Sequence, residues 1–371
     1  MRSDSYRKTV TAGVLKAVNS VYLVKILAGE YYNIFRKRHL YRNVRISESE
    51  EAEIQDMWAK HYGRRISTRW HRLYQSYSGR FNVKYFPEML FTTKLERKLN
   101  NREIGRMISD KSFLAMYYRD IEGVRLPDTY LINNSGVFYT SDRKIISKEK
   151  AHAALENIGA AVFKPTLDSS SGDSVALYDL RHGADRRTGR TLAEVLDSYG
   201  GDFIVQEKII PSGSLKALYD GSVNTLRVIT YLVGDRVFHA PITLSMGRGG
   251  SHVDNIQAGG ISVAVSDDGE LGSEGLTFFG EAHRFHPDTG TLFANHTLPN
   301  IGKLIRVACE MHEKTPHMRM VSWDFTLDEN DDIVLLEFNI FGQSVWFPQM
   351  VSGRAVFGEH TEQMIRMMRQ G

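Results

Sequence analysis

Residues 321–327 and 333–339 read VSWDFTL and IVLLEFN, a β-hairpin pattern that sets carboxylates among apolar residues. The polar run DENDD at 328–332 lies between them and is rich in turn-forming residues. Alternation along a strand sends Glu337 and Asn339 to one face, and the turn brings Asp324 back beside them. The sequence therefore predicts that two carboxylates and an amide oxygen converge.

Oxygen ligands of this kind suit a hard cation such as Mg²⁺, which usually keeps waters and substrate phosphates in its remaining positions. Mn²⁺ accepts the same ligands. We therefore expect a nucleotide site close to the hairpin. The alternative is a structural hairpin in which Glu337 forms a salt bridge and Asn339 ends the strand.

Length and composition describe an ordinary globular protein of two or three domains, with 371 residues, 42% of them hydrophobic and 25% charged. The one cysteine, Cys309, excludes an intramolecular disulfide framework and a cysteine-based metal site. No stretch reaches ~18 apolar residues, and the first residues do not lead into a signal-peptide core. We expect a cytoplasmic protein that is soluble or attached peripherally at the inner face of the membrane.

The basic residues are concentrated near the N-terminus, although the net charge is only +3. Apolar residues between Val14 and Leu27 recur at roughly helical spacing, which predicts a basic amphipathic helix. Such a helix either lies on anionic lipid or packs on its own domain. No stacking motif is interleaved with the basic residues, so nucleic-acid binding is not expected.

The overall pattern is α+β. Residues 1–105 are expected to be mostly helical, and the acidic run 47–51 is a helix start. Strands dominate further on, with helices between them. We expect strands at 126–132, 159–163, 203–207, 223–233, 237–244 and 261–265, and helices at 111–120, 190–199 and 301–314.

A lysine and a loop of small residues follow one of these strands. Lys164 ends the strand 160–165, and the loop DSSSGDS follows at 168–174. The backbone N–H groups of Ser170, Ser171 and Gly172 can approach phosphates closely, and the lysine supplies positive charge. The alternative is an ordinary hairpin turn.

Three later segments carry further candidates. Residues 205–210 predict an edge strand whose backbone can bind adenine, with Glu207 or Lys208 taking the amino group or a ring nitrogen. Arg227 stands among apolar strand residues, either as a contact for transferring phosphate or as a solvated side chain. Asn255 follows Asp254 in a glycine-rich loop near the expected phosphates, or else the pair forms a turn.

Several other chemistries are excluded by their missing motifs. The sequence has no G-x-x-x-x-G-K-[ST] and no G-x-S-x-G. The spacing of the histidines between His283 and His317 matches no zinc signature.

Taken in order, the lysine strand, the small-residue loop, the Gln-Glu strand, the strand arginine and the acidic hairpin resemble the ATP-grasp superfamily. The resemblance runs from about Asp110 to Gly353. Three strings are similar to the sugar-transfer-associated branch of that superfamily, with one departure, because Ser245 stands where an arginine is expected. The strings are Asn224 to Arg227, Gly247 to Asn255 and Gln257 to Ile261.

This resemblance implies a fold in which two α+β subdomains clasp ATP, as in D-alanine:D-alanine ligase. The implied division is a helical, basic region at 1–105, a subdomain with the lysine loop at 106–205 and a metal-binding subdomain at 206–371.

The resemblance also implies roles for individual residues. Asp324, Glu337 and Asn339 would carry Mg²⁺. Lys111 and Lys164 would hold the phosphates, and Arg227, Arg248 and Lys164 would act in catalysis. The adenine would be bound by Gln206, Glu207, Lys208 and Ile209.

The activity that the resemblance implies is ATP-dependent ligation of a carboxylate to an amine or thiol through an acyl phosphate. A sugar acid or glycan precursor and an amino acid are the expected small-molecule substrates. Two alternatives stay open. One is a kinase that phosphorylates a hydroxyl, and the other is a non-catalytic nucleotide-binding partner of a glycosyltransferase.

Overall fold

The structure is a computed structural model that describes residues 23–167 and 175–369. The chain forms two compact units. The first contains the residues up to Asn100 together with those from Gly342 onward, and the second runs from Asn101 to Phe341. The predicted phosphate loop with Ser170, Ser171 and Gly172 lies outside the described residues.

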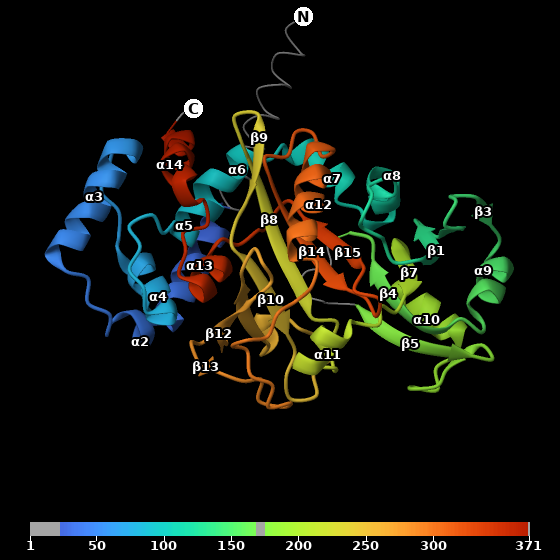
Figure 1. Cartoon of the computed structure of the whole chain (residues 1–371). Coiled ribbons are helices and arrows are strands. Elements are labelled where there is room, and N and C mark those ends of the chain that lie inside the picture. The colour runs from blue at the N-terminus through green and yellow to red at the C-terminus, as the bar shows by residue number, and fades with distance from the viewer. Residues whose placement is uncertain (1–22, 168–174, 370–371) are drawn as a thin grey trace, which may run out of the picture. The chain divides into compact units, whose positions relative to one another are not determined.

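The first unit is helical in its described part, as the sequence predicts (Figure 1). Ser47 caps the helix that begins at Glu48, and Glu50 returns the hydrogen bond to the Ser47 backbone, which completes a capping box. The elements of this unit are a helix at 23–36, α2 (Arg38–Tyr41), α3 (Glu48–Tyr62), α4 (Arg69–Ser78), α5 (Glu88–Leu90), η1 (Phe91–Leu95), α6 (Glu96–Leu99), α13 (Trp346–Ser352), η4 (Gly358–His360) and α14 (Thr361–Arg369).

Helices from both ends of the chain share one core in this unit, because α13 packs against α4 and α14 against α3. Aromatic side chains fill the core, with the rings of Trp58 and Phe357 both edge-on to Phe86. The three-part division expected from the sequence stays a prediction, but the compact units group residues 342–371 with the N-terminal helices.

The second unit begins with short helices and an antiparallel seven-stranded sheet in the order β3-β2-β1-β7-β4-β5-β6. Side chains of α9 and α10 share a buried cluster with this sheet. The elements are α7 (Arg102–Ile108), η2 (Lys111–Phe113), α8 (Leu114–Tyr118), β1 (Thr129–Asn134), β2 (Val137–Tyr139), β3 (Ile145–Ile146), α9 (Lys148–Leu155), β4 (Gly159–Pro165), β5 (Ala176–Arg181), β6 (Ala184–Asp185), α10 (Leu192–Tyr199) and β7 (Phe203–Glu207).

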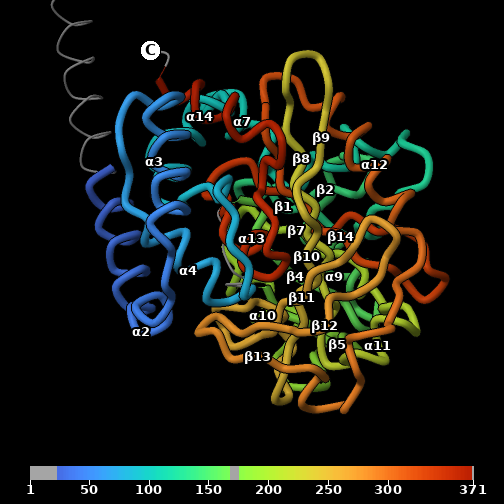
Figure 2. The backbone as a smooth tube through the Cα atoms, turned by 60° about the vertical axis from the view of Figure 1, so that its left-hand side comes forward, coloured from blue at the N-terminus to red at the C-terminus, as the bar shows by residue number. Residues whose placement is uncertain are grey.

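The second sheet of this unit has eight antiparallel strands in the order β13-β12-β11-β10-β8-β14-β15, and β9 also pairs with β8. Figure 2 shows the same backbone turned, with β8 and β10 near the middle of the view. The elements are α11 (Gly213–Leu218), β8 (Thr225–Val233), β9 (Arg236–His239), β10 (Ile242–Met246), η3 (Ile256–Ala258), β11 (Ile261–Val265), β12 (Leu271–Leu276), β13 (Ala282–His283), α12 (Ile301–Glu313), β14 (Met320–Leu327) and β15 (Ile333–Asn339).

The single strand expected at 237–244 is wrong in one respect, because the structure breaks it into β9 and β10. Both pieces pair with β8, one at each end of that strand. Pro241 lies at the break. Proline has no N–H to donate to the ladder, so the strand is interrupted where that residue stands.

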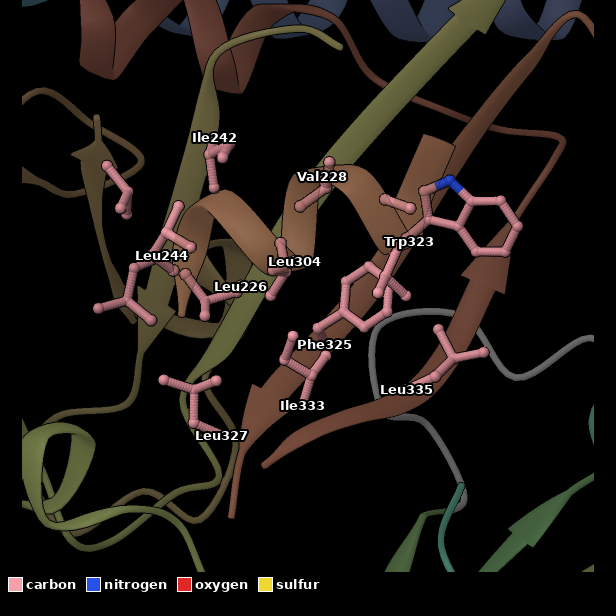
Figure 3. Close-up of a cluster of buried hydrophobic side chains, with 14 of the residues drawn as sticks. Leu226, Val228, Ile242, Leu244, Leu304, Trp323, Phe325, Leu327, Ile333 and Leu335 are labelled. Atoms are coloured by element: carbon pink, nitrogen blue, oxygen red, sulfur yellow. The ribbon is translucent and has the colours of Figure 1, made fainter. Parts of the chain in front are cut away.

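The main core of the second unit lies between this sheet and α12. Figure 3 shows Leu304 of that helix among side chains of the strands, including Leu226, Phe325 and Leu335. Trp323 also lies in this cluster and is fully buried. Within the described residues, no helix is long and apolar enough to cross a membrane.

Truncating Leu304 to alanine should destabilise the fold, because the side chain is 0% exposed and its removal leaves a cavity under the sheet. We expect Leu304→Ala to lower the free energy of unfolding by about 2–5 kcal/mol, measured by urea denaturation. Met116→Ala is the matched control, since Met116 is 62% exposed. Equal unfolding free energies for the two variants would show that packing of Leu304 in this core does not stabilise the unit.

Candidate functional site

A β-bulge in the hairpin decides where its carboxylates point. Asp324 lies opposite Glu337, but Phe325 lies opposite Leu335, so Leu336 is the extra residue. Leu335 and Phe338 both face the core although they are three positions apart. Without the bulge, alternation would send Glu337 to the core beside Leu335. The extra residue therefore keeps Glu337 on the same side of the hairpin as Asp324.

Asp324 is held by the strand arginine. The Arg227 side chain donates from Nε to Oδ1 at 2.7 Å and from Nη2 to Oδ2 at 2.8 Å, a bidentate pair. The two residues are direct cross-strand neighbours on β8 and β14. The Asp324 side chain is 5% exposed and that of Arg227 is 36% exposed. The pair is therefore buried on the acid side and reaches solvent on the arginine side.

Asp324 and Arg227 shift each other's pKa. Burial raises the pKa of the Asp324 carboxyl, and the paired guanidinium opposes that rise. The carboxylate in turn raises the pKa of Arg227. Asn339 also reaches this carboxylate, since its amide Nδ2 donates to Oδ2 of Asp324 at 3.2 Å. Asp324, Asn339 and Arg227 thus form one connected group.

Two lysines from different elements approach Glu337 and its neighbour. Lys111 Nζ lies 3.4 Å from the Glu337 carboxylate. Lys164 Nζ donates to the backbone carbonyl of Leu336 at 3.2 Å. That carbonyl belongs to the bulge residue, where ladder pairing is locally disrupted. Burial lowers the pKa of Lys164 to about 8, while the charge of Glu337 opposes the decrease.

The chain positions both lysines through its backbone. The side chain of Asp110 accepts a hydrogen bond from the N–H of Ser112 and so starts η2. The backbone N–H of Lys111 donates to the carbonyl of Thr166 at 2.9 Å, just beyond the end of β4. This bond brings the start of η2 beside the strand that carries Lys164.

A third carboxylate, that of Asp254, belongs to the same region, and no role was predicted for it from the sequence. Thr225 shares a face of β8 with Arg227, and its Oγ1 donates to Oδ2 of Asp254 at 2.5 Å. Burial raises the pKa of Asp254, with a further rise from the charge of Asp324. The signal in the sequence was its place directly before Asn255, in a loop already expected near phosphates.

The loop that carries Asp254 is packed too closely for side chains at two glycines. A Cβ on Gly247 would lie 2.8 Å from the ring of Tyr219, and one on Gly260 would lie 2.7 Å from the carbonyl of Met246. The Asn255 side chain accepts from the N–H of Gln257 and begins η3. These contacts explain Gly247 and Gly260 as packing requirements.

Arg248 contacts its own loop and Glu281, the residue directly before β13. Its Nε donates to the carbonyl of Gly259 at 2.6 Å, and its Nη1 lies 3.2 Å from Glu281. Its catalytic role stays a prediction, since these contacts do not join it to Asp324. Ser245 lies opposite Thr225 on one side and Ser262 on the other.

Asn224, in the motif Asn-Thr-Leu-Arg, has a structural task. Its backbone is left-handed, with φ at 61°, and its side chain is 0% exposed. The amide Nδ2 donates to the carbonyls of Leu215 and Tyr219. This residue therefore fixes the chain just before the strand that presents Thr225 and Arg227.

The edge strand expected at 205–210 is wrong, because β7 ends at Glu207 and pairs with β1 on one side and with β4 on the other. The expected adenine segment instead joins the two sheets. Arg125 binds the carboxylates of both Glu207 and Asp328, and the N–H of Asp128 donates to Glu207 at 3.1 Å. The side chain of Glu207 is thus already engaged. Lys208 is exposed and Ile209 is buried. A role for this segment in binding adenine stays a prediction.

Gln206 offers an acceptor without a partner. Its Nε2 donates to Oγ1 of Thr129 at 3.2 Å, while its buried Oε1 has no hydrogen-bond partner among the described residues. A buried acceptor left in this way carries a free-energy cost until a donor reaches it. The amino group of an adenine is such a donor.

The donors around the bulge fit a hard divalent cation in their chemistry. Asp324, Glu337 and Asn339 offer two carboxylates and an amide, which are ligands that Mg²⁺ takes. No group of three or more His, Cys, Asp or Glu side chains that could hold a metal occurs in the described part of the chain. Some of the histidines have other contacts, and His312, for example, bonds Thr230 Oγ1 at 2.7 Å.

A protein-family model matches most of the chain. The model described as sugar-transfer associated ATP-grasp matches residues 90–364. The chain is thus an ATP-grasp protein by class, and it belongs to the sugar-transfer associated ATP-grasp family. The α+β fold and the resemblance expected from the sequence are confirmed by this match. No curated protein matches the chain.

The solved structures that resemble this chain are distant. VanG D-Ala:D-Ser ligase from Enterococcus faecalis has a TM-score of 0.41 and 12% identity, over 70% of this chain and 60% of its own. The biotin carboxylase domain of the Hydrogenobacter thermophilus 2-oxoglutarate carboxylase, in complex with MgADP, ADP and bicarbonate, has a TM-score of 0.41 and 12% identity, over 74% of this chain and 48% of its own.

Biotin carboxylase from Campylobacter jejuni, in a complex with β,γ-ATP, has a TM-score of 0.41 and 16% identity, over 72% of this chain and 47% of its own. This chain spans between 47% and 60% of the length of these three proteins. The family assignment therefore rests on the match over residues 90–364.

Breaking the Arg227–Asp324 pair should destabilise the protein more than breaking an exposed pair. We expect Arg227→Met to cost about 2–3 kcal/mol of unfolding free energy, less than a fully buried pair because the guanidinium reaches solvent. The double variant Arg227→Met with Asp324→Asn should cost less than the sum of the single variants. Urea denaturation of all four proteins measures this coupling.

The matched control is the pair Arg248 and Glu281, whose side chains are 32% and 58% exposed. Its coupling should stay below about 1 kcal/mol. Equal coupling energies for the two pairs would contradict the burial argument.

The lowered pKa of Lys164 should make stability depend on pH. The folded value is about 8, whereas a free lysine titrates near 10.4. Between these values the unfolded chain holds the proton and the folded chain does not, so stability rises as pH increases from about 8 to about 10.

Lys164→Met removes this contribution. From about pH 8 to about pH 10, the unfolding free energy of the wild type should increase relative to that of the variant by up to about 3 kcal/mol. Urea denaturation at both pH values measures this difference. Lys148→Met is the control, since Lys148 is 54% exposed. A difference between wild type and Lys164→Met that stays constant with pH would refute the shift.

Proposed function

We propose that the chain is an ATP- and Mg²⁺-dependent ligase that joins a carboxylate to an amine or a thiol and releases ADP and phosphate. The observation that carries the proposal is the approach of Lys111 and Lys164 to the Glu337–Leu336 segment, beside the Asp324–Arg227 pair. Three cations, from η2, β4 and β8, thus approach two carboxylates on the β14–β15 pair. A bound polyphosphate with its metal ion needs this mixture of charges.

Each cation has a task in this proposal. Lys111 and Lys164 bind phosphate oxygens, and Lys164 is poorly solvated, so an anion restores the charge compensation that water gives elsewhere. Asp324, Glu337 and Asn339 would hold Mg²⁺ or Mn²⁺. The metal ion, when bound, neutralises phosphate charge and so favours attack on phosphorus.

The base is proposed to lie against the segment from Gln206 to Ile209. The unpaired Oε1 of Gln206 supports this placement, because it accepts a hydrogen bond that the described residues do not supply. Ile209 is apolar and is proposed to contact the ring. Glu207 is held by Arg125, so its carboxylate serves to fix the segment.

The reaction has two steps. An oxygen of the substrate carboxylate attacks the γ-phosphorus, the bond to the bridging oxygen breaks, and ADP leaves an acyl phosphate behind. The amine nitrogen then attacks the acyl carbon, phosphate leaves, and the amine loses its proton. Arg227 keeps N–H donors beyond the two that Asp324 takes, and they stabilise the transferring charge, with Arg248 as the second candidate.

The proposed substrates rest on the family description alone. Its description associates the ATP-grasp domain with sugar transfer. A sugar acid or glycan precursor as the carboxylate and an amino acid as the amine fit both this description and the ligase reaction. Use of ATP suits the cytoplasm, where we place the protein.

The test is ADP release with Mg-ATP against a panel of sugar acids combined with amino acids. Hydroxylamine in parallel traps an acyl phosphate as a hydroxamate. We expect Lys164→Ala and Glu337→Ala each to lower kcat/KM by about 10²–10³, because each removes a charge aimed at the phosphates or the metal. Lys148→Ala should keep wild-type activity, and thermal unfolding of all variants checks that they are folded.

Other results would move the assignment. ADP formation that depends on an alcohol and gives no hydroxamate would favour the kinase. Binding of ATP without turnover on any pair would favour the non-catalytic partner of a glycosyltransferase. Failure to bind ATP would refute the proposed site.

A further inference from the structure

The helix at 23–36 exposes an apolar face. Five of its large side chains are exposed. Four of them are spaced three or four residues apart, and the fifth, Tyr32, follows Tyr31 directly, so all five lie on one broad side of the helix. They are Val24, Leu27, Tyr31, Tyr32 and Phe35, with exposures of 64%, 39%, 52%, 61% and 57%. The helix is the darkest blue one in Figure 2 and leads into α2.

The opposite side of the same helix packs on the first unit. Ile34 is 5% exposed, and Lys37, directly after the helix, is 2% exposed with its ammonium 4.2 Å from the ring centre of Trp346. These contacts with the first unit therefore fix which side of the helix is buried and which side is exposed. The apolar face is on the outer side.

This concentration of exposed apolar residues is unusual for the chain. Single exposed apolar side chains are common on proteins and need no explanation. Here, fifteen large hydrophobic side chains are exposed over all the described residues, and five of them lie on this one helix. A contiguous patch of this kind marks a surface that contacts something else.

The charge around the face points to an anionic partner. Between residues 23 and 46, Glu30 is the one acidic residue in the sequence, and it is half-buried. The exposed basic residues of this stretch are Lys25, Arg36, Arg38, Arg42 and Arg45.

Cations and aromatic rings also lie together on this surface. The guanidinium of Arg38 is 4.3 Å from the ring centre of Phe35, and that of Arg36 is 5.6 Å from the ring centre of Tyr32. Apolar and aromatic side chains mixed with Lys and Arg are typical of helices that lie in a membrane interface.

We propose that the exposed face of the helix at 23–36 docks the protein on an anionic membrane surface, with the helix lying in the interface plane. Val24, Leu27 and Phe35 enter the boundary between headgroups and acyl chains. The basic residues bind lipid phosphates. A second copy of the chain is a poorer occupant, because a two-fold contact would bring like-charged surfaces together.

The test uses the full chain and sedimentation with vesicles. One set contains phosphatidylcholine alone, and the other an equimolar mixture with phosphatidylglycerol. We expect binding to the mixed vesicles only, weakened by added salt. Arg38→Glu with Arg42→Glu should weaken binding at least thirtyfold, because each cation near the surface contributes about 1 kcal/mol and ~1.4 kcal/mol is tenfold.

The apolar contribution is tested separately. Leu27→Ser with Phe35→Ser should weaken binding roughly tenfold or more, since both side chains then lose their burial in lipid. Met116→Ser with Ile145→Ser is the matched control, because these residues are 62% and 71% exposed in the second unit. That control should bind as the wild type does.

Three results would overturn the proposal. The wild type fails to bind the mixed vesicles, or binds both sets equally, or the variants of the helix face bind as the wild type does. Sedimentation equilibrium that shows a dimer, converted to monomer by Leu27→Ser with Phe35→Ser and without vesicle binding, would assign the face to a second copy. ADP release in solution should be unchanged in the face variants, so this test is independent of the ligase proposal.

Discussion

The extra residue at Leu336 is the constraint on which the candidate site depends. It lets Leu335 and Phe338 both enter the core while Glu337 stays opposite Asp324. It also supplies the carbonyl that the Lys164 ammonium binds. One irregularity in one strand therefore keeps the core apolar, keeps the acids together and gives a buried lysine its partner. A regular strand would satisfy the core only by burying Glu337.

Two cations of the candidate site, Arg227 and Lys164, have unequal counter-charges. Arg227 binds Asp324 with two short hydrogen bonds, whereas Lys164 donates to a neutral carbonyl and the charge of Glu337 offsets only part of its desolvation. Buried charge without a full counter-charge costs free energy. The fold accepts that cost in the second unit, where the core beneath the sheet is large. On the proposed function, the bound phosphates supply the missing counter-charge, so the strain of the free protein becomes affinity for the nucleotide.

The helical unit combines both ends of the chain in one core. Glu88 is 5% exposed and accepts from the N–H of Val345, and Glu96 accepts from the N–H of Gln343. These bonds fix the segment that directly follows Phe341, the last residue of the second unit. The same unit presents the outer face of the helix at 23–36. The family match starts at residue 90. The helix at 23–36 therefore lies outside the matched range, and its packing is not explained by the family.

The sequence by itself determined the two strands of the hairpin at 321–339, the helix start at Ser47, the α+β pattern and, through its motif strings, the family. These features are local, because strand period, capping residues and turn residues act over a few positions. The tertiary structure decided which groups meet. Arg227 and Asp324 are 97 residues apart, and Lys164 is 172 residues from Leu336. Such pairs depend on the register of distant strands and on one bulge, and no local pattern encodes either.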